Sequence, residues 1–139
     1  MATRKLSKIQ VDDERINRWQ DHVIGTLNPV LDRVFASQAW QTPQLLNGWV
    51  NFGAPNADAG FYRDAIGIVH IQGTIKNGIM PSAAFQLPAG YRPLGTLAFP
   101  VDSGGGYAQL LVNAAGFVGP NVGGTLAFHL DGVSFRAEQ

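Results

Sequence analysis

The uneven placement of charged residues and glycines indicates that this chain has two parts with different structures. Residues 1–38 hold eleven of the twenty charged side chains, whereas sixteen of the seventeen glycines follow residue 40. A charged stretch with few glycines suits an amphipathic helix, and a glycine-rich stretch with few charges suits short strands joined by turns. The sequence therefore predicts a boundary near residues 39–43, with one part at 1–39 and the other at 40–139.

Apolar residues of the first part recur at the period of an α-helix. The steps between them are 3, 4, 4, 3 and 4 residues, which average 3.6. These residues are Ile16, Trp19, Val23, Leu27, Val30 and Val34. We expect Asp12 to be the N-cap. We also expect a kink or a restart at Pro29, because proline lacks the N–H that the helical hydrogen bond requires.

This apolar stripe must be covered, because an isolated helix is only marginally stable in water. Three partners remain open: the second part of the same chain, other copies of the chain, or a different docking protein. A helix of about 25 residues is about 38 Å long, which exceeds what a small β domain covers easily. We therefore favour a short, coiled-coil-like bundle of several copies.

The second part has the sequence pattern of an all-β domain. Short apolar runs are separated by turn signals, for example at 64–67, 113–116 and 131–132. Strands are expected at 45–52, 60–63, 67–76, 83–87, 94–102, 107–113, 125–130 and 133–136. Their number and spacing predict a jelly-roll-like antiparallel β-sandwich. Alternation places Leu126, Phe128 and Leu130 together in the core, and residues 120–124 are expected to form a loop.

Composition excludes several classes of function. The ten basic and ten acidic side chains cancel, so nothing attracts a phosphate backbone over long range and no nucleic-acid partner is expected. The absence of cysteine removes disulfides and thiolate metal sites. No apolar run approaches the roughly 20 residues that span a bilayer, and the N-terminus lacks the apolar core of a signal peptide. We expect a soluble protein with no membrane insertion.

Candidate catalytic and metal-binding residues are scarce. His22 belongs to the charged helix, where we expect it to be solvated, whereas His70 and His129 lie on strand faces opposite the core. Each of the latter two could be a metal ligand or a base, but a half-buried, hydrogen-bonded ring is the simpler interpretation. Asp64 and Asp131 stand at turn positions, where aspartate caps its own backbone. We therefore predict no enzyme, no catalytic residue, no metal and no cofactor.

A binding site is easiest to place on the low-charge surfaces. Glycine-rich segments at 53–60, 103–106 and 120–124 are candidate binding loops. Segment 103–106 does not match a phosphate-binding loop, because no lysine and no helix follow it. Six of the aromatic residues of the second part either fill the core and interfaces or offer stacking platforms for a sugar. These six are Trp40, Trp49, Phe61, Tyr62, Tyr91 and Tyr107. The receptor-binding residues themselves stay unassigned.

Four stretches, taken in order, resemble one family. They are residues 40–52 (WQTPQLLNGWVNF), 61–78 (FYRDAIGIVHIQGTIKNG), 85–93 (FQLPAGYRP) and 130–136 (LDGVSFR). Together they resemble a β-rich module at the C-terminal ends of tail-fibre, baseplate and related virion proteins of tailed bacteriophages and prophages. The resemblance covers about residues 40–137.

The resemblance implies a structural virion protein that is homotrimeric and has no catalytic set. Because only 39 residues precede the module, a long shaft has no room, and a short fibre or spike is expected. Its N-terminus would dock on another virion protein of the tail, baseplate or capsid through Arg4, Lys5 and Lys8. The β-sandwich head would present loops to a host-surface glycan or protein. Assembly would take place in the host cytoplasm.

Two other functions stay open at this point. A capsid head-fibre or decoration protein would share the architecture without binding a receptor. A free carbohydrate-binding module would bind sugar without joining a virion.

Overall fold

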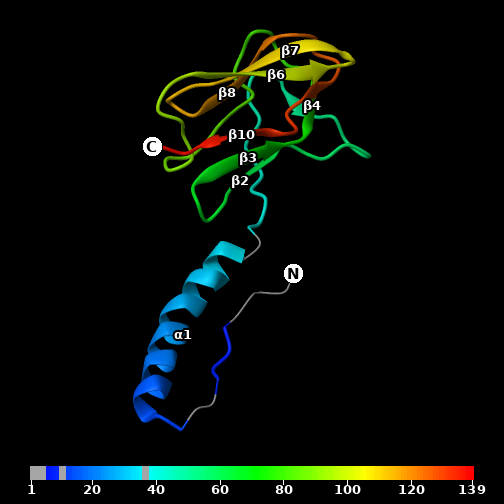
Figure 1. Ribbon diagram of the computed structural model, residues 1–139. Helices are drawn as coiled ribbons and strands as arrows, with labels where there is room; N and C mark the ends of the chain where they lie inside the picture. The colour runs from blue at the N-terminus through cyan, green and yellow to red at the C-terminus, as the bar shows by residue number, and fades with distance from the viewer. Residues whose placement is uncertain (1–5, 10–11, 36–37) are drawn as a thin grey trace. The chain divides into compact units, whose positions relative to one another are not determined.

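The computed structural model describes residues 6–9, 12–35 and 38–139, without the side chains of 33–35. Contacts divide the chain into two compact units, Met1–Gln38 and Ala39–Gln139. The first unit contains the helix α1, and the second contains only strands and loops (Figure 1). The predicted combination of one N-terminal helix with a mainly β, antiparallel second part is confirmed, while the jelly-roll topology and the trimer stay predictions.

Helix α1 spans Glu14–Phe35 and continues through Pro29 without a restart. Proline removes one hydrogen bond and crowds the carbonyl of the preceding turn, yet the apolar stripe stays in phase across Pro29 and the helix continues. The expected cap is wrong by one residue. Asp13, not Asp12, caps the helix, because its carboxylate accepts the backbone N–H of Arg15 at 2.8 Å.

Residues 6–9 run antiparallel to α1 along one flank of the helix (Figure 1). The backbone N–H of Leu6 donates to Asn28 Oδ1 at 2.8 Å, and that of Ile9 donates to Gln20 Oε1 at 2.9 Å. Two side-chain amides of the helix therefore satisfy the backbone of an extended segment that belongs to no sheet.

The second unit is built from three antiparallel sheets (Figure 1). Their orders are β1-β4-β9, β10-β3-β2 and β5-β8-β7-β6. The strands are β1 (Val50–Asn51), β2 (Gly60–Arg63), β3 (Ile68–Gln72), β4 (Thr74–Lys76), β5 (Phe85–Gln86), β6 (Leu97–Ser103), β7 (Gly106–Val112), β8 (Phe117–Val122), β9 (Phe128–His129) and β10 (Val133–Arg136).

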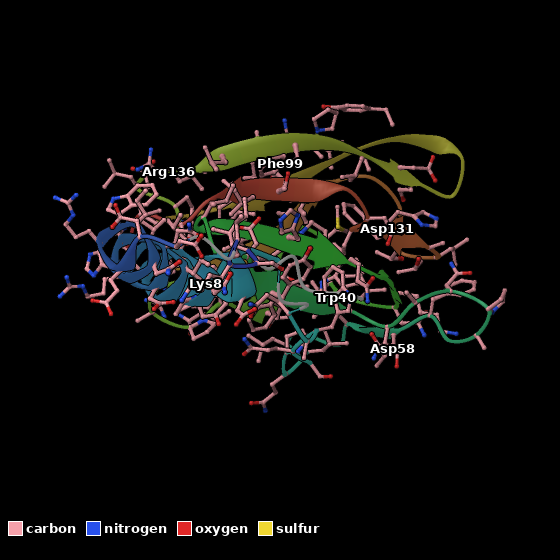
Figure 2. All side chains as sticks on the ribbon, turned by 60° about the horizontal axis from the view of Figure 1, so that its bottom comes forward. Lys8, Trp40, Asp58, Phe99, Asp131 and Arg136 are labelled. Atoms are coloured by element: carbon pink, nitrogen blue, oxygen red, sulfur yellow. The ribbon has the colours of Figure 1, made fainter. Side chains whose placement is uncertain are left out.

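One hydrophobic core lies between these sheets and is supplied by alternate residues of their strands. Val69 and Ile71 of β3 are buried, while the residues between and after them are half-exposed. Across the core, Phe99 of β6 and Phe135 of β10 bring their ring centroids to 6.3 Å; Figure 2 labels Phe99. Period-two alternation therefore decides which side chains remain outside and available for binding.

Three strand predictions need correction. Strand β8 was missed, and residues 120–122 are part of it rather than of a loop. Pro120 fits there because the β7–β8 ladder shifts register between Gln109 and Leu110, so a missing N–H does little harm. Leu126 is 81 % exposed instead of buried. It precedes the short strand β9, so the alternation that buries Phe128 does not extend to it.

The third correction is that residues 67–76 form two strands instead of one. Gly73 separates β3 from β4, which belong to different sheets. Its φ is +115°, and a Cβ at this position would lie 2.6 Å from backbone atoms of Ala59 and Asp58. Only glycine combines this backbone conformation with so close an approach of another segment.

Replacing Gly73 should therefore destabilise the β unit strongly. We expect G73A to lower the free energy of unfolding by about 2–5 kcal/mol, from backbone strain plus steric overlap. Urea denaturation followed by circular dichroism measures this change. G95A is the control, because nothing lies within 4 Å of a Cβ there, and it should stay within about 0.5 kcal/mol of the parent. Equal stability of the two variants would contradict the role of Gly73.

Candidate functional site

The outer face of sheet β10-β3-β2 carries a row of polar and aromatic side chains. Tyr62 of β2 and Ser134 of β10 are both register partners of His70 on β3. The three side chains therefore lie side by side across the sheet. They point away from the core because their strand neighbours, such as Phe61 and Val133, are buried.

Trp40 extends this row beyond the edge of β2. The next residue, Gln41, exchanges two backbone hydrogen bonds with Phe61, at 2.7 and 3.0 Å. The indole packs over Gly60, where a Cβ would lie 3.5 Å from the Trp40 ring, an ordinary van der Waals distance. The indole meets the Tyr62 ring edge to face, with centroids 4.6 Å apart. Trp40 is thus held by backbone and by ring packing, yet it stays 44 % exposed.

His70 is fixed on two sides. Its ring stacks on Tyr62 at 4.7 Å, and its Nε2 lies 2.9 Å from Asp64 Oδ2. Asp64 sits in the turn between β2 and β3, where its Oδ1 accepts the backbone N–H groups of Ile66 and Ile68 at 3.1 and 2.9 Å. The aspartate that was predicted to cap a turn therefore also orients the histidine beside it.

The pKa of Asp64 lies below its ordinary value of 3.8. Burial acts in the opposite direction and raises it, but the hydrogen bonds from His70, Ile68 and Ile66 lower it by more in total, with a contribution from the charge of His70. The carboxylate therefore stays ionised under ordinary conditions and keeps the histidine ring in place.

These residues border a hollow of about 330 Å³, which we call the aromatic hollow. This volume is near the lower end of the range for small-molecule sites. The lining residues are Trp40, Tyr62, His70, Ile71, Gln72, Asp131, Gly132, Val133 and Ser134. Figure 2 labels Trp40 and Asp131, which come from opposite ends of the unit's sequence.

Polar groups in the aromatic hollow are free to bond a ligand. Within the described residues, the side chains of Gln72 and Ser134 have no hydrogen-bond partner, nor do the Trp40 indole N–H and the Tyr62 hydroxyl. Asp131 is anchored, because its Oδ1 accepts the backbone N–H of Gly73 at 2.9 Å. Its other oxygen lies 3.7 Å from His129 Nδ1.

His129 occupies a neighbouring cluster between two aspartates. Its Nδ1 lies 3.1 Å from Thr74 Oγ1, and its Nε2 lies 3.6 Å from Asp102 Oδ2. The two aspartates approach opposite nitrogens of the ring, so the three groups do not converge on one point. In the described part of the chain, no group of three or more His, Asp or Glu residues is arranged to hold a metal ion.

A second hollow of about 330 Å³ lies over β7 and β8. It is lined by Pro81, Ser82, Ala83, Thr96, Leu111, Asn113, Phe117, Gly119, Pro120 and Asn121. It has no ionisable side chain and one aromatic ring. The side-chain amide of Asn121 already donates to Gln109 at 2.8 Å. The second hollow therefore offers fewer free polar groups than the aromatic hollow.

The predicted stem residues lie along one face of α1. Trp19 is 65 % exposed, and Ile16, Leu27 and Val30 are 42–47 % exposed, while Val23 is half-buried. The side chain of Val34 is outside the described residues. Whether this face is an oligomer interface stays a prediction.

The predicted docking residues are only partly described. Arg4 and Lys5 lie outside the described residues. Lys8 forms an ion pair with Asp21 of α1, with 3.2 Å between Nζ and Oδ1. His22 is exposed on α1, as expected. Among the candidate loops, 103–106 is a tight β6–β7 hairpin in which Gly104 and Gly105 have positive φ, so its glycines serve the turn.

Sequence reasoning did not assign the aromatic hollow. The sequence did place His70 on the face opposite the core, and Trp40 and Tyr62 were among the possible sugar platforms. What was missing was the register that brings β2, β3 and β10 together and sets Asp131 beside Trp40. Two signals in the sequence pointed toward this face: the position of His70 opposite the core and the turn expected at 131–132.

Stability should depend on the ionisation of Asp64. Its pKa is lowered by folding, so its contribution is fully present above the unfolded value of 3.8 and is lost as pH falls through the folded value. As the pH is lowered below about 5, we expect the urea midpoint of the parent protein to decrease by more than that of D64N. D58N, which removes an exposed carboxylate elsewhere, should follow the parent. Parallel pH profiles for the parent and D64N would contradict this assignment.

No protein-family model matches the chain, and the search of curated proteins found no significant match. Among solved structures, the chain is similar to the receptor binding protein (gp15) of Listeria phage PSA. The TM-score is 0.68 at 15 % sequence identity, and the match covers 96 % of this chain and 83 % of the other. At this identity the likeness establishes a shared fold.

Proposed function

We propose that this chain is a structural virion protein of a bacteriophage, a short homotrimeric fibre or spike that attaches the particle to its host. The observation that carries the proposal is the fold, which is shared with a phage receptor binding protein over 96 % of the chain. The resemblance of residues 40–137 to virion modules supports it independently. The β unit would be the jelly-roll-like head, and the role would be binding without catalysis.

The trimer is supported by the apolar face of α1. Leaving Trp19 at 65 % exposure on a helix is costly unless another surface covers it. Residues 6–9 do not provide this cover for the whole stripe: Leu6 and Ile9 border a hollow with Trp19 and Val23, yet Trp19, Leu27 and Val30 stay 42–65 % exposed. A parallel bundle of three copies would bury Ile16, Trp19, Leu27 and Val30 at its centre.

Docking on the virion is assigned to the N-terminal basic residues Arg4, Lys5 and Lys8. Since Lys8 is paired with Asp21 at 3.2 Å, it would have to exchange this partner for one on the particle. Within the described residues, no helix is long and apolar enough to cross a membrane. We propose neither a nucleic-acid partner nor membrane insertion, and we propose assembly in the host cytoplasm.

A charge in the stem stripe should abolish assembly. We expect the parent chain to have a native mass of about 45 kDa, three times the chain mass of 14.9 kDa. W19D should be monomeric, because burying an unpaired carboxylate costs several kcal/mol. Light scattering measures the mass, and circular dichroism checks that the β unit stays folded.

Arg18→Asp is the matched control for W19D. It introduces the same residue one position away, on the polar side of α1, where Arg18 is exposed. This variant should keep the trimeric mass. A monomeric parent, or a W19D variant of unchanged mass, would contradict the stem interface.

Attachment is tested on cells and on particles. The labelled parent protein should bind cells of the host bacterium and reduce phage adsorption, whereas monomeric W19D should bind them more weakly. Immunogold labelling of virions should place the protein on the tail. Label on the capsid, together with no binding to cells, would instead support a head-fibre or decoration protein without a receptor role.

A further inference from the structure

We propose that the aromatic hollow binds a neutral saccharide, an inference that rests on the proposed attachment role. A pyranose ring would lie against Trp40, and its hydroxyls would bond the side chains of Gln72, Ser134 and Asp131.

Trp40 supplies the platform for the sugar ring. It is 44 % exposed although its neighbourhood holds it firmly, through the Gln41–Phe61 bridge and the edge contact with Tyr62 at 4.6 Å. The face of an indole is electron-rich and attracts the polarised C–H groups of a pyranose. Because the ring is already ordered, little conformational entropy is lost when a ligand stacks on it.

The polar lining matches a polyol. The amide of Gln72 offers donors and an acceptor, and the hydroxyl of Ser134 offers both, with no partner for either among the described residues. Asp131 adds a strong acceptor that is already oriented, because Gly73 N–H holds one of its oxygens at 2.9 Å. Sugar hydroxyls both donate and accept, so they can satisfy all three side chains at once.

The charges of the hollow select a neutral ligand. No lysine or arginine is among the lining residues, and Asp131 contributes a carboxylate. The Nε2 of His70 is engaged with Asp64 at 2.9 Å. A sugar acid or a phosphate would therefore meet a negative charge without a basic side chain to pair with it. Anionic glycans are therefore disfavoured in the hollow relative to neutral ones.

The NMR signals of the tryptophan indole N–H groups in the full chain provide the test. The three indoles lie in different places: Trp40 in the hollow, Trp49 buried in the core, and Trp19 exposed on α1. A ¹⁵N-labelled sample is titrated with millimolar methyl glycosides of glucose, galactose, mannose, rhamnose, N-acetylglucosamine and N-acetylgalactosamine. Glucuronic acid and N-acetylneuraminic acid are the anionic comparison.

We expect at least one neutral sugar to shift the indole N–H signal of Trp40 and to leave those of Trp19 and Trp49 unchanged. W40A should weaken this binding at least about tenfold, as followed on the backbone signals of Gln72 and Ser134. Q72A should weaken it about fivefold while Trp40 stays in place. Y107A removes an exposed aromatic ring of the β6–β7 hairpin and should bind like the parent.

Three results would overturn the proposal. They are the absence of a Trp40 shift with every neutral sugar, equal shifts with the anionic sugars, and unchanged binding in both W40A and Q72A. The attachment role fails separately. If neutral sugars bind at Trp40 but the protein does not bind host cells, saccharide binding in the hollow is confirmed and the attachment role is contradicted. If W40A binds cells like the parent and no sugar shifts the Trp40 signal, the attachment role is confirmed and saccharide binding in the hollow is contradicted.

Discussion

The β unit depends on a close approach at Gly73. Its N–H donates to the carboxylate of Asp131, and its C=O accepts the N–H of Leu130 at 2.8 Å, so both backbone groups bind the segment before β10. A neighbouring segment, Asp58–Ala59, passes so close that a Cβ at Gly73 would lie 2.6 Å from it. At this point the chain leaves one sheet and enters another. The same contact closes the fold and positions Asp131 at the edge of the aromatic hollow.

The residues around the hollow are positioned by fixed contacts rather than by long flexible loops. Register sets Tyr62, His70 and Ser134 side by side, and the Asp64 carboxylate orients the histidine. A site built this way is ordered before the ligand arrives, which reduces the entropic cost of binding. The face tolerates little backbone change, because a one-residue shift in the register of β3 would turn His70 into the core.

Periodicity was sufficient for much of this architecture and insufficient for the site. The 3.6-residue period of the stem residues predicted α1, and the expected strands 60–63 and 133–136 match β2 and β10. Such patterns are local, whereas the hollow joins Trp40 to Asp131 across the unit, and no local pattern encodes that pairing. The strand that was missed, β8, contains Gly119 and Pro120, which usually end strands but fit here at an irregular ladder.

Local rules also failed where a neighbouring segment sets the outcome. Asp12 and Asp13 are equally good caps by residue type, and only the geometry of the first turn selects Asp13. Residues 67–76 read as one strand because a single glycine does not interrupt alternation in the sequence. The break at Gly73 arises from contact with Asp58 and Ala59 and from its backbone angle. The period of the apolar residues predicted the stripe of α1, but it does not indicate which surface covers that stripe.

The low charge of the β unit affects how tightly the proposed binding site could hold its ligand. Several of its few charged groups are bound internally: Asp64 pairs with His70, Arg63 donates to Gly90 O at 2.9 Å, and Arg92 donates to Leu87 O at 2.9 Å. The four basic and five acidic side chains of this unit nearly cancel, so long-range electrostatic steering contributes little to encounter. The proposed stacking of one sugar ring in a hollow of about 330 Å³ would give weak affinity by itself. The proposed trimer would join several hollows through one stem, and such multivalency raises affinity by about 10²–10⁴ without any new contact. An attachment role based on this hollow therefore requires the association of copies through the helix.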